Sequence, residues 1–213
     1  MGPLRSSAPA LLGAAVLLAG CSSGPDGDTE KATPSATATT TRTPSSTVAV
    51  PSGVALTAQG SALAFGDPAR VIFESKRNRG TVLRLTVRSV RQGTLEDFDG
   101  FILDDRYKQK ASYYYATVSV RNVGRGDVGG VGVPLWGVDR SKTLLPPVTF
   151  TTRFAPCPTR ELPSRFGPGD ALTTCLVFLS PGKGRLAGIS YRPSQEFDPV
   201  TWTGTIRPAH RAR

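Results

Sequence analysis

Hydrophobic and polar residues alternate one by one along several short stretches of the chain. The clearest is segment 81–90, whose two faces carry the apolar set Leu83, Leu85 and Val87 and the polar set Arg84, Thr86 and Arg88. A strand that is buried on one face only has this period of two. The segment therefore predicts a β-strand whose leucines and valine belong to a core.

The same alternation predicts further strands. Segment 113–122 places Ala116, Val118 and Val120 inward and has, on its outer face, Tyr113, Tyr115, Thr117 and Ser119. In segment 171–179 one face is shared by Cys175, Val177 and Leu179. Weaker patterns indicate strands at 70–73, 133–138, 148–151, 186–191 and 200–203.

Turn residues separate these segments, as at Gly66-Asp67-Pro68 and Pro181-Gly182. No amphipathic helix of three turns is visible in this part of the sequence, and we find no internal repeat. Many short strands separated by Gly and Pro are typical of an antiparallel β-sandwich. We expect a single all-β, immunoglobulin-like sandwich over residues 61–204 and a basic tail at 205–213.

The first twenty residues follow another pattern. Arg5 is the one charge before an uncharged and largely apolar run that ends at Gly20. This is the arrangement of a secretory signal, and the run is too short for a stable membrane span.

The run ends in Leu18-Ala19-Gly20-Cys21, which resembles the lipobox of bacterial lipoproteins. In that family a diacylglycerol is attached to the Cys sulfur and the signal is cleaved directly before it. The resemblance implies that residues 1–20 are removed and that Cys21 anchors the chain to the extracytoplasmic face of the cell membrane. The alternative is an ordinary signal peptide with an incidental cysteine.

Residues 22–47 contain no aromatic side chain and no aliphatic side chain larger than Ala. Such a segment buries too little apolar surface to offset its ordering entropy, so we predict a disordered tether. Together with the lipidated cysteine we assign it to residues 21–60. Twenty-six residues of this composition span about 30 Å, which holds a domain clear of the lipid headgroups.

The chain is basic, with 26 Lys and Arg residues against 16 acidic residues. An exported basic domain is attracted to anionic lipids, anionic wall polymers or an acidic partner protein. We do not expect nucleic acid as a partner, because the basic residues are scattered and no aromatic residues are interleaved with them. Scattered, solvated charge is the plain alternative. The excess of Arg over Lys, 20 to 6, indicates a GC-rich genome and an actinobacterial source.

Besides Cys21 the chain has two cysteines, Cys157 and Cys175. In an oxidising compartment two such cysteines predict a disulfide. Two cysteines and one histidine, His210, are too few for the usual metal-ligand sets.

Five segments of the sequence carry a family resemblance: 63–67, 83–90, 117–124, 166–170 and 175–178. In that order they resemble the secreted bacterial immunoglobulin-like domains typified by the mycobacterial immunoprotective extracellular protein. Many actinobacterial lipoproteins of unknown function resemble the same domain. The resemblance covers about residues 60–192 and implies the sandwich fold. It implies no activity, because that family has no shared catalytic residues.

Groups for catalysis are scarce in this sequence. Its only histidine, His210, makes a Ser-His-Asp triad improbable, and the disulfide would remove both cysteines as nucleophiles. The sequence has no G-x-S-x-G, no H-E-x-x-H and no glycine-rich phosphate loop between a strand and a helix. We expect no enzymatic activity and no cofactor.

Carboxylates are concentrated in one stretch, at Glu96, Asp97, Asp99, Asp104 and Asp105. Ca²⁺ takes several carboxylate oxygens from one loop, which makes Asp97, Asp99, Asp104 and Asp105 candidate ligands. The spacing lacks the alternating ligands of a calcium loop, and paired carboxylates for glycoside hydrolysis have no other support. We favour an acidic surface loop that pairs with Arg106 and Lys108.

Tyr113 and Tyr115 lie on the outer strand face, where Tyr and Trp are favoured anchors of interfaces. Trp136 is a further candidate for that face, although Trp136 and Trp202 fit a sandwich core better. We therefore expect a non-enzymatic protein-interaction module of the cell envelope. Its partner is another envelope protein or an anionic wall polymer, and an ion- or small-molecule-binding lipoprotein is the alternative.

Overall fold

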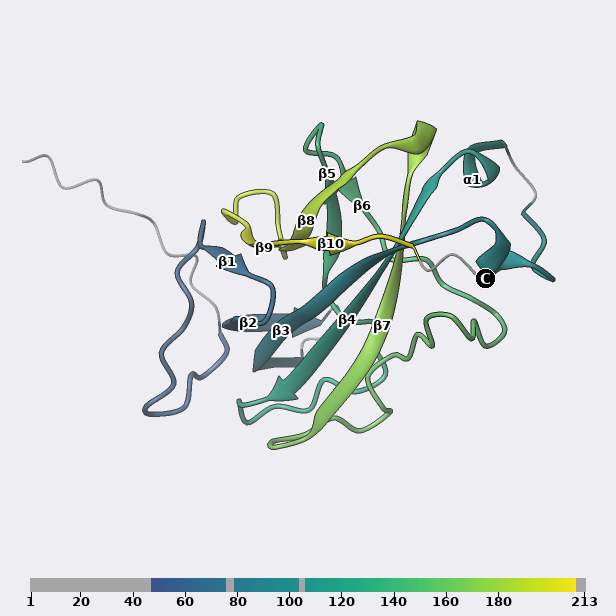
Figure 1. Ribbon diagram of the computed structural model, residues 1–213. Helices are drawn as coiled ribbons and strands as arrows, with labels where there is room; N and C mark the ends of the chain where they lie inside the picture. The colour runs from purple at the N-terminus through teal and green to yellow at the C-terminus, as the bar shows by residue number, and fades with distance from the viewer. Residues whose placement is uncertain (1–46, 76–78, 104–105, 210–213) are drawn as a thin grey trace, which may run out of the picture. The chain divides into compact units, whose positions relative to one another are not determined.

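The computed structural model describes residues 47–75, 79–103 and 106–209, and these form two facing β-sheets (Figure 1). One sheet has the order β1 (Ala62–Ala64), β9 (Val200–Thr203), β8 (Leu186–Tyr191), β5 (Trp136–Asp139) and β6 (Leu144–Leu145). The other has the order β10 (Ile206–Arg207), β3 (Arg79–Gly93), β4 (Ser112–Asn122) and β7 (Ala171–Ser180), with β2 (Pro68–Ser75) also paired to β3.

Neighbouring strands are antiparallel except for the pairs β1–β9 and β10–β3, which are parallel. Helical structure in the described residues is limited to the single turns η1 (Glu96–Phe98), α1 (Arg106–Gln109) and η2 (Pro181–Lys183). The expected all-β sandwich is confirmed.

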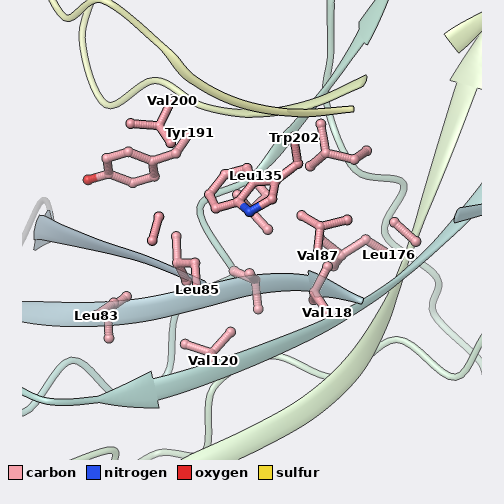
Figure 2. Close-up of a cluster of buried hydrophobic side chains, with 14 of the residues drawn as sticks. Leu83, Leu85, Val87, Val118, Val120, Leu135, Leu176, Tyr191, Val200 and Trp202 are labelled. Atoms are coloured by element: carbon pink, nitrogen blue, oxygen red, sulfur yellow. The ribbon is translucent and has the colours of Figure 1, made fainter. Parts of the chain in front are cut away.

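The main core lies between the two sheets (Figure 2). The inward residues predicted for β3 and β4 are all buried in it: Leu83, Leu85, Val87, Ala116, Val118 and Val120. The facing sheet contributes the large side chains of Tyr191 and Trp202. Trp202 is fully buried and its indole N–H donates a hydrogen bond to the Asp67 carbonyl oxygen at 2.9 Å, whereas Trp136 is half-buried.

A β-bulge keeps β3 in register with the core. Val87 pairs with Val118 and Ser89 pairs with Thr117, so Arg88 is one residue too many on the β3 side. Strict alternation would turn Val90 outward. Because of the extra residue, Val90 faces the core with an exposed fraction of 0%.

Two weaker strand predictions need correction. Segment 133–138 begins its strand only at Trp136, because Pro134 has no N–H to donate to a neighbour. Segment 148–151 is not a strand. It touches the edge of β7 through the Val148 N–H, which donates to the Val177 carbonyl oxygen, and then leaves the sheet to pass over its outer face.

The predicted domain boundaries are too narrow at both ends. Residues 47–60 lie against the sandwich, where the Thr57 N–H donates to the Arg70 carbonyl oxygen and the Gly60 N–H to that of Asp198. A β-carbon on Gly80 would lie 2.2 Å from Val48, so Gly80 allows this close approach. At the other end, residues of the expected tail form β10.

Cys21 and His210 lie outside the described residues. Within those residues, no helix is both long and apolar enough to cross a membrane.

The predicted disulfide between Cys157 and Cys175 is confirmed, with Cα atoms 5.3 Å apart. Cys175 belongs to β7 and points to the outer face of the sheet, together with Val177 and Leu179 as predicted. Cys157 lies in the segment that covers this face and is fully buried. The bridge therefore fastens an irregular segment onto a regular strand.

Reduction of this disulfide is expected to lower the free energy of unfolding by about 3 kcal/mol, because the unfolded chain regains the entropy of an open loop. For a domain of this size the melting temperature should fall by about 6–12 °C. Thermal unfolding followed by circular dichroism, with and without reductant, measures the change. The Cys157→Ser, Cys175→Ser double variant should melt at the temperature of the reduced wild type, and its melting temperature should not change when reductant is added. Equal melting of reduced and oxidised wild type would contradict the prediction.

Candidate functional site

One half of the outer face of the β3–β4–β7 sheet is covered by an aromatic layer. Its members are Phe98, Phe101, Tyr113, Tyr115, Phe150 and Phe154. The ring centroids of Phe98 and Tyr113 are 4.4 Å apart, and those of Phe150 and Phe154 are stacked at 4.6 Å. Segments 94–103 and 146–157 supply the covering rings.

The prediction that Tyr113 and Tyr115 are exposed interaction anchors is wrong. Both point to the outer face as expected, but their exposed fractions are only 3% and 1%, because the covering segments exclude water. The Tyr113 hydroxyl donates to the Lys108 carbonyl oxygen, and the Tyr115 hydroxyl to Oδ2 of Asp97 at 2.9 Å. Burial raises the pKa of both phenols, so they remain hydrogen-bond donors.

Arg91 closes the edge of this layer. Its guanidinium carbon lies 4.4 Å from the centroid of the Tyr115 ring, and its Nη2 donates to the Pro156 carbonyl oxygen at 2.6 Å. The cation–π contact and the hydrogen bond join β3 to the segment that carries Cys157. These groups hold the layer on the sheet.

Of the four candidate calcium ligands, Asp97 and Asp99 are described, whereas Asp104 and Asp105 lie outside the described residues. Oδ2 of Asp97 accepts two hydrogen bonds, from the Thr94 N–H at 3.0 Å and from the Tyr115 hydroxyl. Its carboxylate thus fastens η1 to the sheet. Among the described residues no group of three or more His, Cys, Asp or Glu side chains is arranged to hold a metal ion.

We therefore expect that millimolar Ca²⁺ leaves the melting temperature of the protein unchanged. A real site at a hundredfold excess over Kd would add about 2.7 kcal/mol, or about 5–10 °C, which is easily measured by differential scanning fluorimetry. A rise of that size in the wild type that is absent in Asp99→Asn would restore the calcium hypothesis.

A small pocket of about 220 Å³ lies beside the aromatic layer. Its lining includes Phe150, Phe154, Arg160 and Glu161. The neighbouring Arg160 and Glu161 carry opposite charges, so the pocket has no preference for a charged ligand of either sign.

A groove of about 860 Å³ opens at one end of the sandwich, where the end of β3, the start of β4, the turn after β5 and the η2 turn meet. Both sheets contribute to it. It is lined by Gln92, Gly93, Thr94, Leu95, Gln109, Ala111, Ser112, Tyr113, Tyr114, Arg140, Lys183, Arg185, Leu186 and Ile206. We call it the basic groove, because its lining has three cationic residues and, within the described chain, no acidic one.

Two turns bring these cations together. The Arg140 N–H donates to the Arg185 carbonyl oxygen at 3.0 Å, and the Lys183 N–H donates to the Lys110 carbonyl oxygen at 2.9 Å. Lys183 has φ +60°, one of two positive φ values outside glycine among the described residues; the other, φ +64°, is at Lys142 in the turn of Arg140. Such backbone strain is concentrated at functional sites.

Two acidic residues directly adjoin lining residues of the groove in sequence, Glu96 after Leu95 and Asp139 before Arg140. Oδ1 of Asp139 accepts hydrogen bonds from the Ser141 hydroxyl at 2.7 Å and from the Thr143 N–H at 2.8 Å. These bonds, first that of the Ser141 hydroxyl, lower the pKa of Asp139. The Asp139 carboxylate is thus engaged by groups of its own turn.

The groove lies far from the segment at which the described chain begins. Val48 contacts the β3 end marked by Gly80, whereas the groove takes Gln92 and Gly93 from the opposite end of the same strand. At about 3.3 Å per residue the two ends are separated by about 40 Å.

Sequence reasoning did not find this groove. Arg140, Lys183 and Arg185 are scattered singly along the chain, and only the pairing of β5 with β8 brings their turns together. A comparison with family models, with curated proteins and with solved structures gave no match. The immunoglobulin-like family resemblance therefore stays a prediction.

Proposed function

We propose that this chain is a membrane-anchored extracytoplasmic lipoprotein, a non-enzymatic module that binds a partner protein of the cell envelope in the basic groove. The groove itself supports this proposal, because its lining has three cations and, in the described chain, no acidic residue. Lys142 and Lys183, in the two turns that bring the cations together, have positive φ values. The lipobox at Cys21 supplies the anchor.

The lining favours an acidic protein segment with apolar side chains. Leu95 is 46% exposed at the groove, and the half-buried Ile206 adds aliphatic surface beside the cations. Protein interfaces combine an apolar centre with polar and charged groups around it, and cations there attract an oppositely charged partner. The groove presents both kinds of surface to one ligand.

Its position suits this use. Because the groove is about 40 Å from the tether end of β3, an anchored domain can present it to partners away from the lipid surface. The tether end of the domain and the groove thus lie at opposite ends of β3.

The Cys21→Ala variant is expected to accumulate as unprocessed precursor or to be shed into the medium, because only a thiol receives the diacylglycerol. Fractionation of cells and incorporation of labelled palmitate measure the change. Palmitate incorporation that persists in Cys21→Ala would contradict the anchor and leave the groove untouched as a hypothesis.

Photo-crosslinking tests the groove. A photoreactive residue at position 95 of the full-length protein, expressed in its native envelope, should give a discrete adduct with one envelope protein. The Arg140→Gln, Arg185→Gln double variant should reduce the adduct at least about tenfold, because it removes two charge-assisted contacts. Adduct yield is read on immunoblots.

The matched control is Arg125→Gln, Arg153→Gln, which removes the same charge from exposed positions outside the groove. It should leave the adduct yield unchanged. An equal loss in both double variants would show that net charge alone attracts the partner, and would contradict binding in the groove.

A further inference from the structure

The uncovered half of the outer face carries a row of arginines. Strand pairing places Arg70 of β2 opposite Arg84 of β3, and Arg84 opposite Arg121 of β4. All three are exposed, and their neighbours along each strand, such as Ala69, Leu85 and Val120, point into the core. The three side chains therefore leave one face side by side. We call them the arginine ladder.

Hydroxyl groups form the next row of the same face. Thr86 pairs with Ser119, and Ser119 pairs with Thr173. The Ser119 and Thr173 hydroxyls are 3.0 Å apart, and the bulge residue Arg88 donates from Nε to the Ser119 hydroxyl. The bulge thus aims a fourth arginine along the hydroxyl row.

No carboxylate stands among the paired positions of these two rows in the described chain. The nearest acid on this face of β2, Glu74, lies four residues from Arg70, or about 13 Å along the strand, and is opposite Gly80. Like charges directly opposite one another destabilise a sheet. Three arginines in one row therefore act against folding, and a local conflict of this kind is expected at a functional surface.

The chemistry of the face selects its ligand. An interface with a protein needs apolar or aromatic anchors, and the two rows offer Arg, Thr and Ser with only Pro68 and Ala171 at their ends. Guanidinium groups bind phosphate and carboxylate oxygens through paired hydrogen bonds, and spacing across three strands extends the row over about 10 Å. Such a row fits charges that repeat along a chain.

We propose that the arginine ladder and its hydroxyl row bind a linear anionic polymer of hydroxylated units, either a phosphodiester-linked polyol or an acidic polysaccharide. The arginines bind the repeated anionic groups, and the Thr86, Ser119 and Thr173 hydroxyls exchange hydrogen bonds with hydroxyls of the polymer. This site is separate from the basic groove and does not depend on the function proposed for it.

The first test concerns the ladder itself. Arg84→Thr should raise the melting temperature of the full-length protein by up to about 4 °C at 10 mM salt, because it removes repulsion from Arg70 and Arg121. The gain should shrink at 1 M salt, where exposed charges are screened. A lower melting temperature at both salt concentrations would show that Arg84 has stabilising partners, and would overturn the ladder as an unbalanced charge row.

The second test is binding. Full-length protein in a non-ionic detergent is titrated with poly(glycerol phosphate) and with polygalacturonate, which separate the two sources of repeated anions. Binding to at least one is expected, weakening as salt rises because bound counterions are released. Arg84→Gln, Arg121→Gln should weaken it at least about tenfold. The groove variant Arg140→Gln, Arg185→Gln removes the same charge and should stay within about twofold of wild type.

Three outcomes would overturn the proposal. One is equal weakening by the two double variants, which would indicate net charge without a site. Another is equally tight binding of poly-L-glutamate, an anionic chain without hydroxyls. A third is tighter binding of oligo(dT), which would reassign the face to nucleic acid. Failure of the wild-type protein to give a photo-crosslinked adduct, with polymer binding intact, would instead contradict only the groove.

Discussion

The antiparallel pairing of β3 with β4 determines which side chains face the core and which form the outer surface of this sheet. On one face, the pairing directs leucines and valines into the core that Trp202 and Tyr191 complete from the other sheet. On the opposite face, it sets the two tyrosines under the aromatic layer at one end and the arginines in a row at the other. The bulge at Arg88 lies between these two regions. It keeps the inward residues of β3 facing the core on both sides, while the outer face changes from basic to aromatic.

Sequence reasoning could predict the parts of the fold that follow a period. Alternation identified β3, β4 and β7, and the inward residues of β3 and β4, because a half-buried strand has to separate its two kinds of side chain. The disulfide was predictable from the cysteine count, because only Cys157 and Cys175 remain beside Cys21. Sequence reasoning could not predict that Tyr113 and Tyr115 are covered, because the covering segments have no period and are joined to the sheet by Cys157 and Val148.

The charged surfaces escaped sequence reasoning for a related reason. Arg70, Arg84 and Arg121 are adjacent only through the register of three strands, and Arg140 and Arg185 only through the meeting of two turns. A scattered basic composition thus becomes two organised surfaces after folding. The groove combines cations with aliphatic side chains, whereas the ladder combines them with hydroxyls, so the two differ in the ligands they can select.

The contact of Val48 with the Gly80 end of β3 has a mechanical consequence. If the anchor lies before residue 47 and a partner occupies the groove, tension between them acts along β3. The hydrogen bonds from β3 to β4 are perpendicular to the strands, so a load that enters β3 at Gly80 and leaves through the start of β4 at the groove shears many of them at once. A pull across the sheet would instead open them one after another. Under that condition the pairing of β3 with β4 would carry the load in the direction in which a sheet resists it best.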